Sequence, residues 1–174
     1  MSKITIAPTG RERSFGEDEI IVSKTDGTGR ITYANSVFLK VALYEEHEVL
    51  GQPHSIVRHP DMPRCVFKLL WDTVQDGREI FAYVKNMAKN GDFYWVFAHV
   101  TPSFAGGDSI VGFHSNRRVP DADKIDMVRP LYRTLCDIEE SHADRKAGLE
   151  ASTAALMATL QEKGVEYDEF VLTL

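Results

Sequence analysis

The sequence has few cysteines, no long apolar run and no apolar leader. Its two cysteines, Cys65 and Cys136, lie far apart and form no CxxC motif, which argues against a disulfide framework or a thiolate metal site and suits a reducing compartment. No stretch approaches the roughly 18–20 apolar residues that a bilayer span requires, and no apolar segment follows the charged N-terminus. We therefore expect a cytoplasmic protein that does not cross a membrane by itself.

The motifs of common catalytic sites are missing as well. The sequence contains no GxGxxG or GxxxxGKS/T phosphate loop, no GxSxG nucleophile turn and no paired spacing of zinc ligands. These absences argue against an enzyme, so we expect neither catalytic residues nor a metal site.

Negative charge is concentrated in the last third of the chain. Residues 1–120 carry 14 acidic and 14 basic side chains, whereas residues 121–174 carry 12 acidic and 6 basic ones, which accounts for the net charge of −6. A neutral body with an acidic end offers no basic surface for nucleic acid or anionic lipid. The acidic end is either a set of solvated helix faces or a surface for a partner.

The pattern along the chain predicts three segments. Residues 1–18 show little apolar periodicity and should form a flexible arm or a segment that orders against a partner. Residues 19–120 form the body, and residues 121–174 form an acidic helical segment for output or docking. In this last segment Pro130 should kink or split one helix, and a second helix should follow Gly148 and stop at Gly164. The final YDEFVLTL is either a packed element or a docking peptide.

The body alternates between short strands and short helices. Two β-rich runs at 19–24 and 30–33 flank a glycine-rich turn, short helical turns follow up to 64, a regular helix covers 65–75, and three further β-rich runs lie at 80–87, 93–104 and 109–116. This order predicts an α+β fold in which an antiparallel sheet carries helices on one face.

Several motifs of the body resemble one family. ITYAN, GQPHSIVRHPDMP, VKNMAKNGDFYWV and IVGFHSNRR are similar to the flavin-binding PAS domains of aerotaxis receptors, and the similarity covers about residues 19–118. EIFAYVKN and the terminal YDEFVLTL resemble the stand-alone PAS proteins of bipartite energy-taxis systems. The resemblance implies a PAS fold, with a five-stranded antiparallel sheet and short helices on one face, followed here by C-terminal helices.

The resemblance also implies an FAD held between the sheet and the helical loops. Within GQPHSIVRHPDMP the family motif assigns FAD binding to Arg58, His59 and Asp61. Arg58 would supply a fixed positive fork for a pyrophosphate or an anionic ring, and His59 a hydrogen bond or a charge near neutrality. Asp61 would orient His59 or bind a ribose hydroxyl. In the alternative interpretation, Arg58 and Asp61 form an ion pair that only braces the loop.

Two carboxamides are further candidates for the flavin site. Asn35 and Asn86 can each donate and accept a hydrogen bond at the edge of an isoalloxazine ring. We prefer Asn86 as the residue that reports the redox state of the flavin. The alternatives are a plain helix N-cap for Asn35 and a solvent contact for Asn86.

Aromatic side chains could form the wall of the flavin site. Three candidates are Phe67, Trp71 and Trp95, although buried aromatic residues often serve only as core. Many flavin-binding relatives carry a Pro-Trp pair at the start of the third strand, where this chain has Glu79 and Ile80. A stacking or gating aromatic ring is therefore missing there, unless Phe81 or Tyr83 replaces it.

Two alternatives to FAD remain open. Four histidines could give a haem-based gas sensor its axial ligand: His54, His59, His99 and His114. The other alternative is a PAS domain that binds no cofactor and only interacts with other proteins. Light-driven adduct formation is not expected, because Cys65 lies in PRCVFK and not in the NCRFLQ-like setting of light-sensing relatives.

The resemblance thus implies a cytoplasmic sensor of redox state or energy taxis that binds FAD and signals to a membrane-bound chemoreceptor-type protein. Self-association into a PAS homodimer is expected, whereas nucleic acid is not an expected partner. The run at 93–100 is apolar on both faces of its strand. One face can cover the core, and the other requires a partner or the N-terminal arm.

Overall fold

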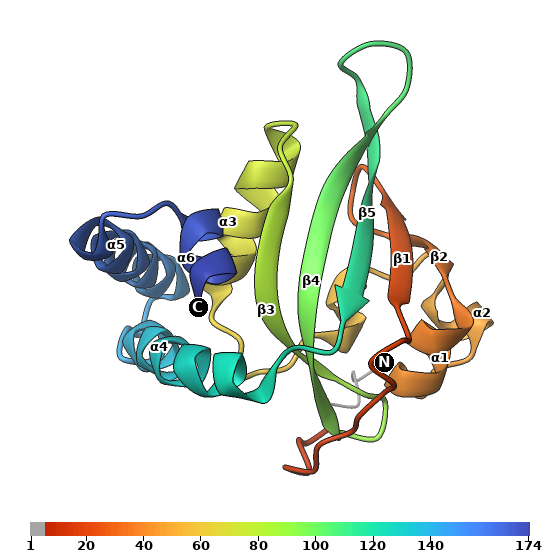
Figure 1. Cartoon of the computed structure of the whole chain (residues 1–174), viewed down its shortest axis with the longest axis horizontal. Coiled ribbons are helices and arrows are strands. Elements are labelled where there is room, and N and C mark those ends of the chain that lie inside the picture. Colours follow the sequence, from red (N-terminus) through yellow and green to blue (C-terminus); the bar gives the residue numbers. More distant parts are fainter. Residues whose placement is uncertain (1–5) are drawn as a thin grey trace.

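The fold is organised around one antiparallel sheet (Figure 1). The structure is a computed structural model that describes residues 6–174. Its five strands are β1 (Ile21–Asp26), β2 (Ile31–Ala34), β3 (Ile80–Met87), β4 (Phe93–Phe104) and β5 (Ile110–Arg118), in the spatial order β2-β1-β5-β4-β3. Every pair of neighbouring strands is antiparallel. The predicted α+β class and five-stranded sheet are confirmed.

Short helices between β2 and β3 cover one face of the sheet. They are α1 (Ser36–Ala42), α2 (Glu46–Val49), the 3-10 helix η1 (His54–Val57) and α3 (Arg64–Gln75). Pro53 and Pro63 are the N-caps of η1 and α3, because proline fixes an extended entry and cannot continue a preceding helix. The regular helix predicted at 65–75 is confirmed as α3.

Side chains of each strand alternate between two faces of the sheet. On β4, Ala98 and Val100 point toward η1 and α3, where they line a cavity. Phe97 and His99 alternate with these residues along β4, so their side chains point to the opposite face of the sheet. We call the helix-covered side the inner face and the opposite side the outer face.

The described part of the N-terminal arm lies along the start of β4. The N–H of Arg13 donates to the carbonyl of Phe93 at 2.7 Å, and the N–H of Phe93 donates to the carbonyl of Arg11 at 2.9 Å. Asp92 accepts a hydrogen bond from Nε of Arg11 at 3.3 Å, and Phe15 is buried. This segment therefore orders against the chain's own sheet, while residues 1–5 lie outside the described part.

Three C-terminal helices gather beside β3, at one edge of the sheet (Figure 1). They are α4 (Ala122–Glu140), α5 (Arg145–Lys163) and α6 (Tyr167–Thr173). The α4–α5 hairpin packs on α3, and α6 packs on β3. Tyr167, Phe170 and Val171 of α6 are buried, so YDEFVLTL is a packed element. In residues 6–174, no helix combines the length and the apolar character of a membrane span.

The start of α5 differs from the sequence-based expectation. The helix begins at Arg145, where Oδ2 of Asp144 accepts the N–H of Ala147 at 2.8 Å, and not after Gly148. Gly148 therefore lies inside α5. A Cβ at this position would stand 2.6 Å from the carbonyl oxygen of Glu139. Only glycine permits this close approach of α4 and α5.

The two other expectations for these helices concern a proline and a glycine. α4 runs through Pro130 as one helix, so the alternative of a split at this residue is excluded. Gly164 ends α5 with a φ of 68°, a left-handed conformation that favours glycine. The predicted stop of the helix is thus confirmed.

Candidate cofactor site

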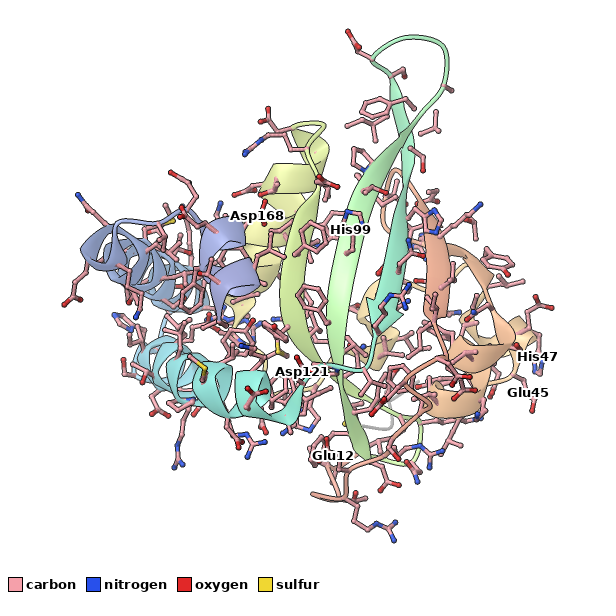
Figure 2. The ribbon with its side chains drawn as sticks, in the orientation of Figure 1. Glu12, Glu45, His47, His99, Asp121 and Asp168 are labelled. Atoms are coloured by element: carbon pink, nitrogen blue, oxygen red, sulfur yellow. The ribbon has the colours of Figure 1, made fainter. Side chains whose placement is uncertain are left out.

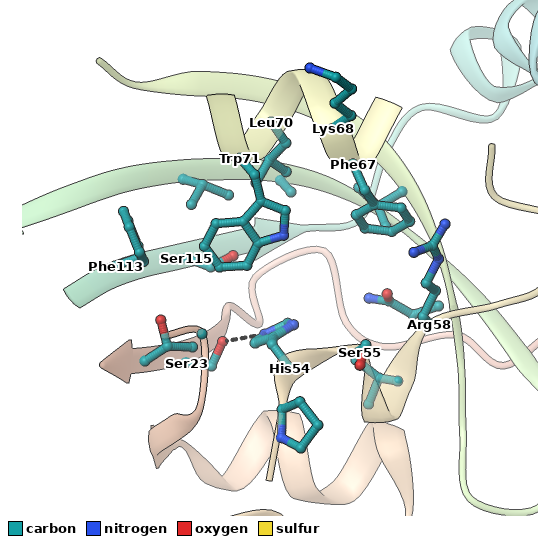
Figure 3. Close-up of a pocket in the computed structure, with 18 of the residues that line it drawn as sticks. Ser23, His54, Ser55, Arg58, Phe67, Lys68, Leu70, Trp71, Phe113 and Ser115 are labelled. Carbon is teal, nitrogen blue, oxygen red and sulfur yellow. Dashed lines mark hydrogen bonds between the residues drawn. The ribbon is translucent and has the colours of Figure 1, made fainter. Parts of the chain in front are cut away.

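A cavity of about 590 Å³ lies between the inner face of the sheet and the helices η1 and α3 (Figure 3). It also receives residues from the first turns of α5. Four of the residues that the sequence suggested for FAD binding line this cavity: Arg58, Phe67, Trp71 and Asn86. A space of this size with apolar walls suits a small organic ligand or cofactor.

Aromatic rings of α3 form one wall of the cavity. Trp71 packs edge-on against Phe113 of β5, with 5.2 Å between ring centroids. Gly29, with a φ of 81°, lies so close to the indole that a Cβ would stand 2.9 Å from Cη2 of Trp71. The guanidinium of Arg58 lies over the ring of Phe67, 4.2 Å from the ring centroid. These flat surfaces suit a planar ligand.

Arg58 and Asn86 reach the cavity from adjoining backbone positions. An isolated antiparallel bridge joins them, so the start of the RHPDMP loop runs beside β3. Asn86 is only 4% exposed, and its carboxamide can offer both a donor and an acceptor to a ligand. The site thus combines a fixed cation with an adaptable polar group.

Cations, and no anions, line the cavity. The basic residues are Arg58, Arg64, Lys68, Arg117 and Arg145, and no Asp or Glu of the described chain is among the lining residues. Arg117 is buried, Arg58 and Arg64 are partly buried, and Lys68 and Arg145 are exposed at the edge of the cavity. A buried charge is costly unless an anion or hydrogen-bond acceptors compensate it. The arrangement therefore favours an anionic ligand.

Arg117 is the most deeply buried of these cations. It is 2% exposed, and burial lowers its pKa to about 10. Nη2 donates a hydrogen bond to Oγ of Ser23, whereas Nε and Nη1 have no partner among residues 6–174. Buried polar groups are nearly always hydrogen-bonded, so Arg117 is an incompletely paired buried charge beside the cavity.

His54 completes a chain of polar groups with Ser23 and Arg117. Nε2 of His54 lies 2.9 Å from Oγ of Ser23 (Figure 3). Burial, together with the charge of Arg117, lowers the pKa of His54 to about 3. The imidazole is therefore neutral at pH 7, and the guanidinium remains the charged member of the group.

Asn35 does not line the cavity. Its Oδ1 accepts the N–H of Phe38 at 3.0 Å and the N–H of Val22 at 3.0 Å, and its Nδ2 donates to the carbonyl of Ile20 at 2.8 Å. The side chain thus starts α1 and ties it to β1. The structure supports the N-cap alternative for this residue.

His59 and Asp61 also lie outside the cavity lining and shape the loop that carries Arg58. Nδ1 of the buried His59 accepts the N–H of Asp61 at 3.1 Å. Burial, with the charge of Lys85, lowers the pKa of His59 to about 4, so this histidine does not gain a charge near neutrality as expected. Asp61 pairs with Lys85 at 2.6 Å and not with Arg58.

Trp95 lies on the outer face of the sheet. It stacks against Tyr132 of α4 with 6.3 Å between ring centroids, which makes it part of the core between the sheet and α4. Phe81 and Tyr83 project from the same face, where Phe81 stacks on His99 at 4.2 Å; Figure 2 labels His99. Neither ring replaces the missing tryptophan inside the cavity.

Sequence reasoning missed most of the polar lining residues, among them Ser23, Arg64, Lys68, Arg117 and Arg145. Arg117 could have been found, because the alternation in IVGFHSNRR places Phe113 and Arg117 on the same inner face, and arginine is unusual at an inward strand position. Arg145 gave no such signal, since α5 reaches the cavity only through tertiary packing.

Comparison with known proteins agrees with this geometry. A family model described as PAS fold matches residues 20–117. The chain belongs to the PAS family. Over 127 residues, 73% of this chain and 25% of the relative, it is 40% identical to the aerotaxis receptor of Escherichia coli (strain K12). The predicted resemblance to PAS domains of the aerotaxis type is confirmed.

This PAS protein is also similar to a second regulatory protein and to a solved structure. It is 28% identical to the nitrogen fixation regulatory protein of Klebsiella pneumoniae over 83 residues, 48% of this chain and 17% of that protein. The chain thus spans a quarter or less of the length of both relatives. The dark structure of the blue-light photoreceptor Aureochrome1 LOV has the same fold, with a TM-score of 0.56 and 21% identity over 62% of this chain and 80% of that chain.

Proposed function

We propose that this PAS protein is a sensor of redox state for aerotaxis or energy taxis, and that it binds FAD in the cavity on the inner face. The charge of the cavity carries the proposal, because five basic residues and no acidic one line a space with aromatic walls. FAD combines a flat ring with two phosphates and, when bound, supplies reversible uptake of electrons. The 40% identity to an aerotaxis receptor supports the sensory role.

The partnerless donors of Arg117 support the fit of this cofactor independently. Nε and Nη1 have no acceptor among the described residues, and a flavin ring bound beside Arg117 would bring several acceptors near them. A PAS domain without any ligand would leave both donors unsatisfied, at about 1–3 kcal/mol for each such group. The alternative of an empty interaction module is therefore less favoured.

We assign separate tasks to the residues of the cavity. Arg58, held flat on Phe67, binds negative charge of the cofactor, and Trp71 packs against its ring. Asn86 reads the redox state, because its carboxamide can exchange donor for acceptor when the protonation of the ring edge changes. Arg117 stabilises negative charge on the ring in its reduced form.

The remaining predicted residues act by positioning in this proposal. His59 and Asp61 hold the loop of Arg58 through their 3.1 Å hydrogen bond. Asn35 fixes α1 against β1, and Trp95 transmits contacts from the sheet to α4 through its stacking on Tyr132. A change at the cofactor would thus reach the arm and the C-terminal helices by shifting the balance between two packings.

Haem fits these residues less well. His54 is the histidine that lines the cavity, and its Nε2 is engaged with Ser23 at 2.9 Å. An axial iron ligand at Nε2 would break this hydrogen bond and leave Ser23 with Arg117 alone. A haem-based gas sensor remains the second candidate only because one histidine reaches the site.

The partners belong to the same proposal. We infer that the protein acts in the cytoplasm, pairs with a second copy and signals to a membrane-bound chemoreceptor-type protein. Partly exposed aromatic rings on the outer face support a contact there. Phe81 stacks on Phe97 with 5.8 Å between centroids and on His99 with 4.2 Å, and the described arm covers only the start of β4.

The absorption spectrum of the purified full chain tests the proposal. We expect flavin bands that bleach on reduction, and release of about one FAD per chain on denaturation. A Soret band that shifts with carbon monoxide would favour haem instead. A colourless protein that also fails to bind added FAD would contradict flavin sensing altogether.

A further inference from the structure

The C-terminal segment contributes to the cavity, although its composition is acidic. Arg145 and Leu149 of α5 line the cavity beside Arg58, Arg64 and Lys68. We propose that Arg58, Arg64, Lys68 and Arg145 form a phosphate-binding site for a flavin nucleotide, so that α5 supplies part of the cofactor site. This inference rests on the flavin binding proposed above, and we call these four residues the cationic mouth.

Two members of the cationic mouth, Arg64 and Arg145, are in direct contact. Nη1 of Arg64 donates to the backbone carbonyl of Arg145 at 2.8 Å. The pKa of Arg58 is lowered, chiefly by burial; the carboxylate of Glu139 raises it, and the positive charges of Arg64 and Arg145 lower it further. Arg58, which follows η1, therefore senses the charges of an arginine on α3 and an arginine on α5. Figure 3 shows Arg58 beside Phe67 and Lys68 on the next position of α3.

The charges of the cationic mouth are only partly compensated. Arg64 pairs with Glu139 at 2.8 Å, and Lys68 pairs with Asp72. Arg58 and Arg145 have no carboxylate partner within the part of the chain that the structure describes. About two positive charges are left, which matches the negative charge of about two on a phosphate monoester or a pyrophosphate diester. Arginine forks also fit phosphate oxygens geometrically.

A buried contact fixes α5 at this place. Oε2 of Glu139 accepts the N–H of Arg64 at 3.0 Å and its Nε at 2.8 Å, while Oε1 accepts the N–H of Cys65 at 3.0 Å and Oγ of Ser152 at 2.9 Å. One carboxylate of α4 thus joins the N-terminus of α3 to α5. The backbone of α5 at Arg145 is thereby held beside α3 before any ligand binds, which leaves only the exposed Arg145 side chain to be ordered.

The cationic mouth changes the expectation for residues 121–174. The sequence predicts solvated helix faces or an output and docking role for these residues, and in this proposal α5 also brings a cation to the cofactor site, while none of its acidic residues lines the cavity. A phosphate bound between α3 and α5 would link the sensor body to the hairpin directly. Loss or rearrangement of the cofactor would then loosen the hairpin.

Binding of three flavins of graded charge tests the proposal. Riboflavin, FMN and FAD are titrated into the full chain freed of cofactor, for the natural sequence, R145E and K146E. Lys146 is the matched control, because it is the next residue of α5, its side chain is 84% exposed and it pairs only loosely with Glu150 at 3.9 Å. Both substitutions change the net charge equally, and a thermal melt checks that each variant folds.

We expect R145E to weaken FAD and FMN binding by about tenfold or more, which corresponds to about 1.4 kcal/mol. Riboflavin, which lacks phosphate, should bind both variants as tightly as it binds the natural chain. K146E should change each affinity by less than about twofold. K68E, on α3, should weaken FAD and FMN binding in the same way as R145E. A comparison of the losses in FMN affinity and FAD affinity tells whether one phosphate or two bind in the cationic mouth.

Two results would overturn the proposal. Equal affinities of R145E and K146E for all three flavins would show that α5 does not bind phosphate, while flavin binding by the natural chain would still support the proposed function. An equal loss of riboflavin and FAD binding in R145E would show that Arg145 acts through the fold. If the natural chain bound none of the three, the proposed function itself would fail.

Discussion

Two buried charges in this molecule have opposite surroundings. Glu139 of α4 is 8% exposed and accepts hydrogen bonds from Arg64, Cys65 and Ser152. Arg117 of β5 is 2% exposed and donates to a single acceptor, with two nitrogen atoms left without a partner in the described chain. The hydrogen bonds of the first charge are satisfied within the fold, whereas those of the second are incomplete.

The pKa values of the two groups express the same difference. Burial raises the pKa of Glu139, but its backbone and side-chain donors outweigh burial and hold the pKa below its ordinary value. Burial lowers the pKa of Arg117 to about 10, because no carboxylate compensates it. A buried charge therefore indicates function when its hydrogen bonds are incomplete, and structure when they are complete.

Removal of the Glu139 carboxylate should have the largest effect. E139A leaves the N-terminus of α3 and the Arg64 guanidinium without their acceptor, so we expect a loss of about 3–5 kcal/mol in the free energy of unfolding. Urea denaturation measures it. E140A is the control, because Glu140 is exposed on the same helix, and should cost less than about 0.5 kcal/mol. Similar losses in both variants would remove the distinction between the two buried charges.

Substitution of Arg117 should separate stability from binding. R117M replaces an incompletely paired charge by an apolar chain, so the cofactor-free protein should be as stable as the natural one or more stable. Its affinity for FAD should fall by about 30-fold, or about 2 kcal/mol. Fluorescence titration and denaturation together measure both effects, with R118M at the exposed neighbour as control. If cofactor-free R117M were less stable than the natural chain by several kcal/mol, Arg117 would be a residue that stabilises the fold, as Glu139 is.

A methyl group at Gly148 should disturb the surroundings of the hydrogen-bonded Glu139 without removing its carboxylate. The new Cβ would stand 2.6 Å from the carbonyl oxygen of Glu139 and 3.2 Å from Nη2 of Arg64. We expect G148A to cost about 1–2 kcal/mol, because overpacking outweighs the gain in helix propensity. Thermal denaturation measures the cost. A more stable G148A would mean that α4 and α5 can separate without loss.

The pH dependence of stability at His54 tests the charge environment that His54 shares with Arg117. Its pKa is about 3 in the fold and 6.5 ordinarily, so between these values the unfolded chain binds a proton that the folded chain does not. Stability should therefore decrease as the pH falls below 6.5. H54Q should show a shallower decrease between pH 7 and pH 5 in denaturation experiments. An equal slope in H54Q would show that burial and the charge of Arg117 do not keep His54 neutral in the folded chain.

Local patterns were sufficient to predict the sheet and α3. The glycine-rich turns and the alternation of apolar residues set the strands, and the prolines set where the helices begin. The motif GQPHSIVRHPDMP led to Arg58, which lines the cavity, but also to His59 and Asp61, which lie behind it. A motif identifies a loop, and only the packing of the loop decides which of its side chains face the ligand.

Long-range packing was not predictable from the sequence. Trp95 belongs to a strand with two apolar faces, and its assignment to the cavity or to the α4 side depended on where α4 would pack. The role of Glu139 was equally hard to predict, because in sequence it looks like any solvated carboxylate of an acidic segment. Its hydrogen-bond donors come from α3 and α5 and are brought together only by the tertiary fold. Both residues acquire their roles from elements distant in sequence.

The outer edge of β3 has a further consequence for how this chain meets other chains. Side chains occupy three of its outward backbone groups: the N–H of Phe81 donates to Oδ1 of Asp168 at 3.3 Å, and the carbonyl of Tyr83 accepts the hydroxyl of Tyr132 at 2.7 Å. The N–H of Lys85 donates to the sulfur of Met62 at 3.2 Å. An edge occupied at these positions is a poorer template for a foreign strand, which opposes strand addition and aggregation there.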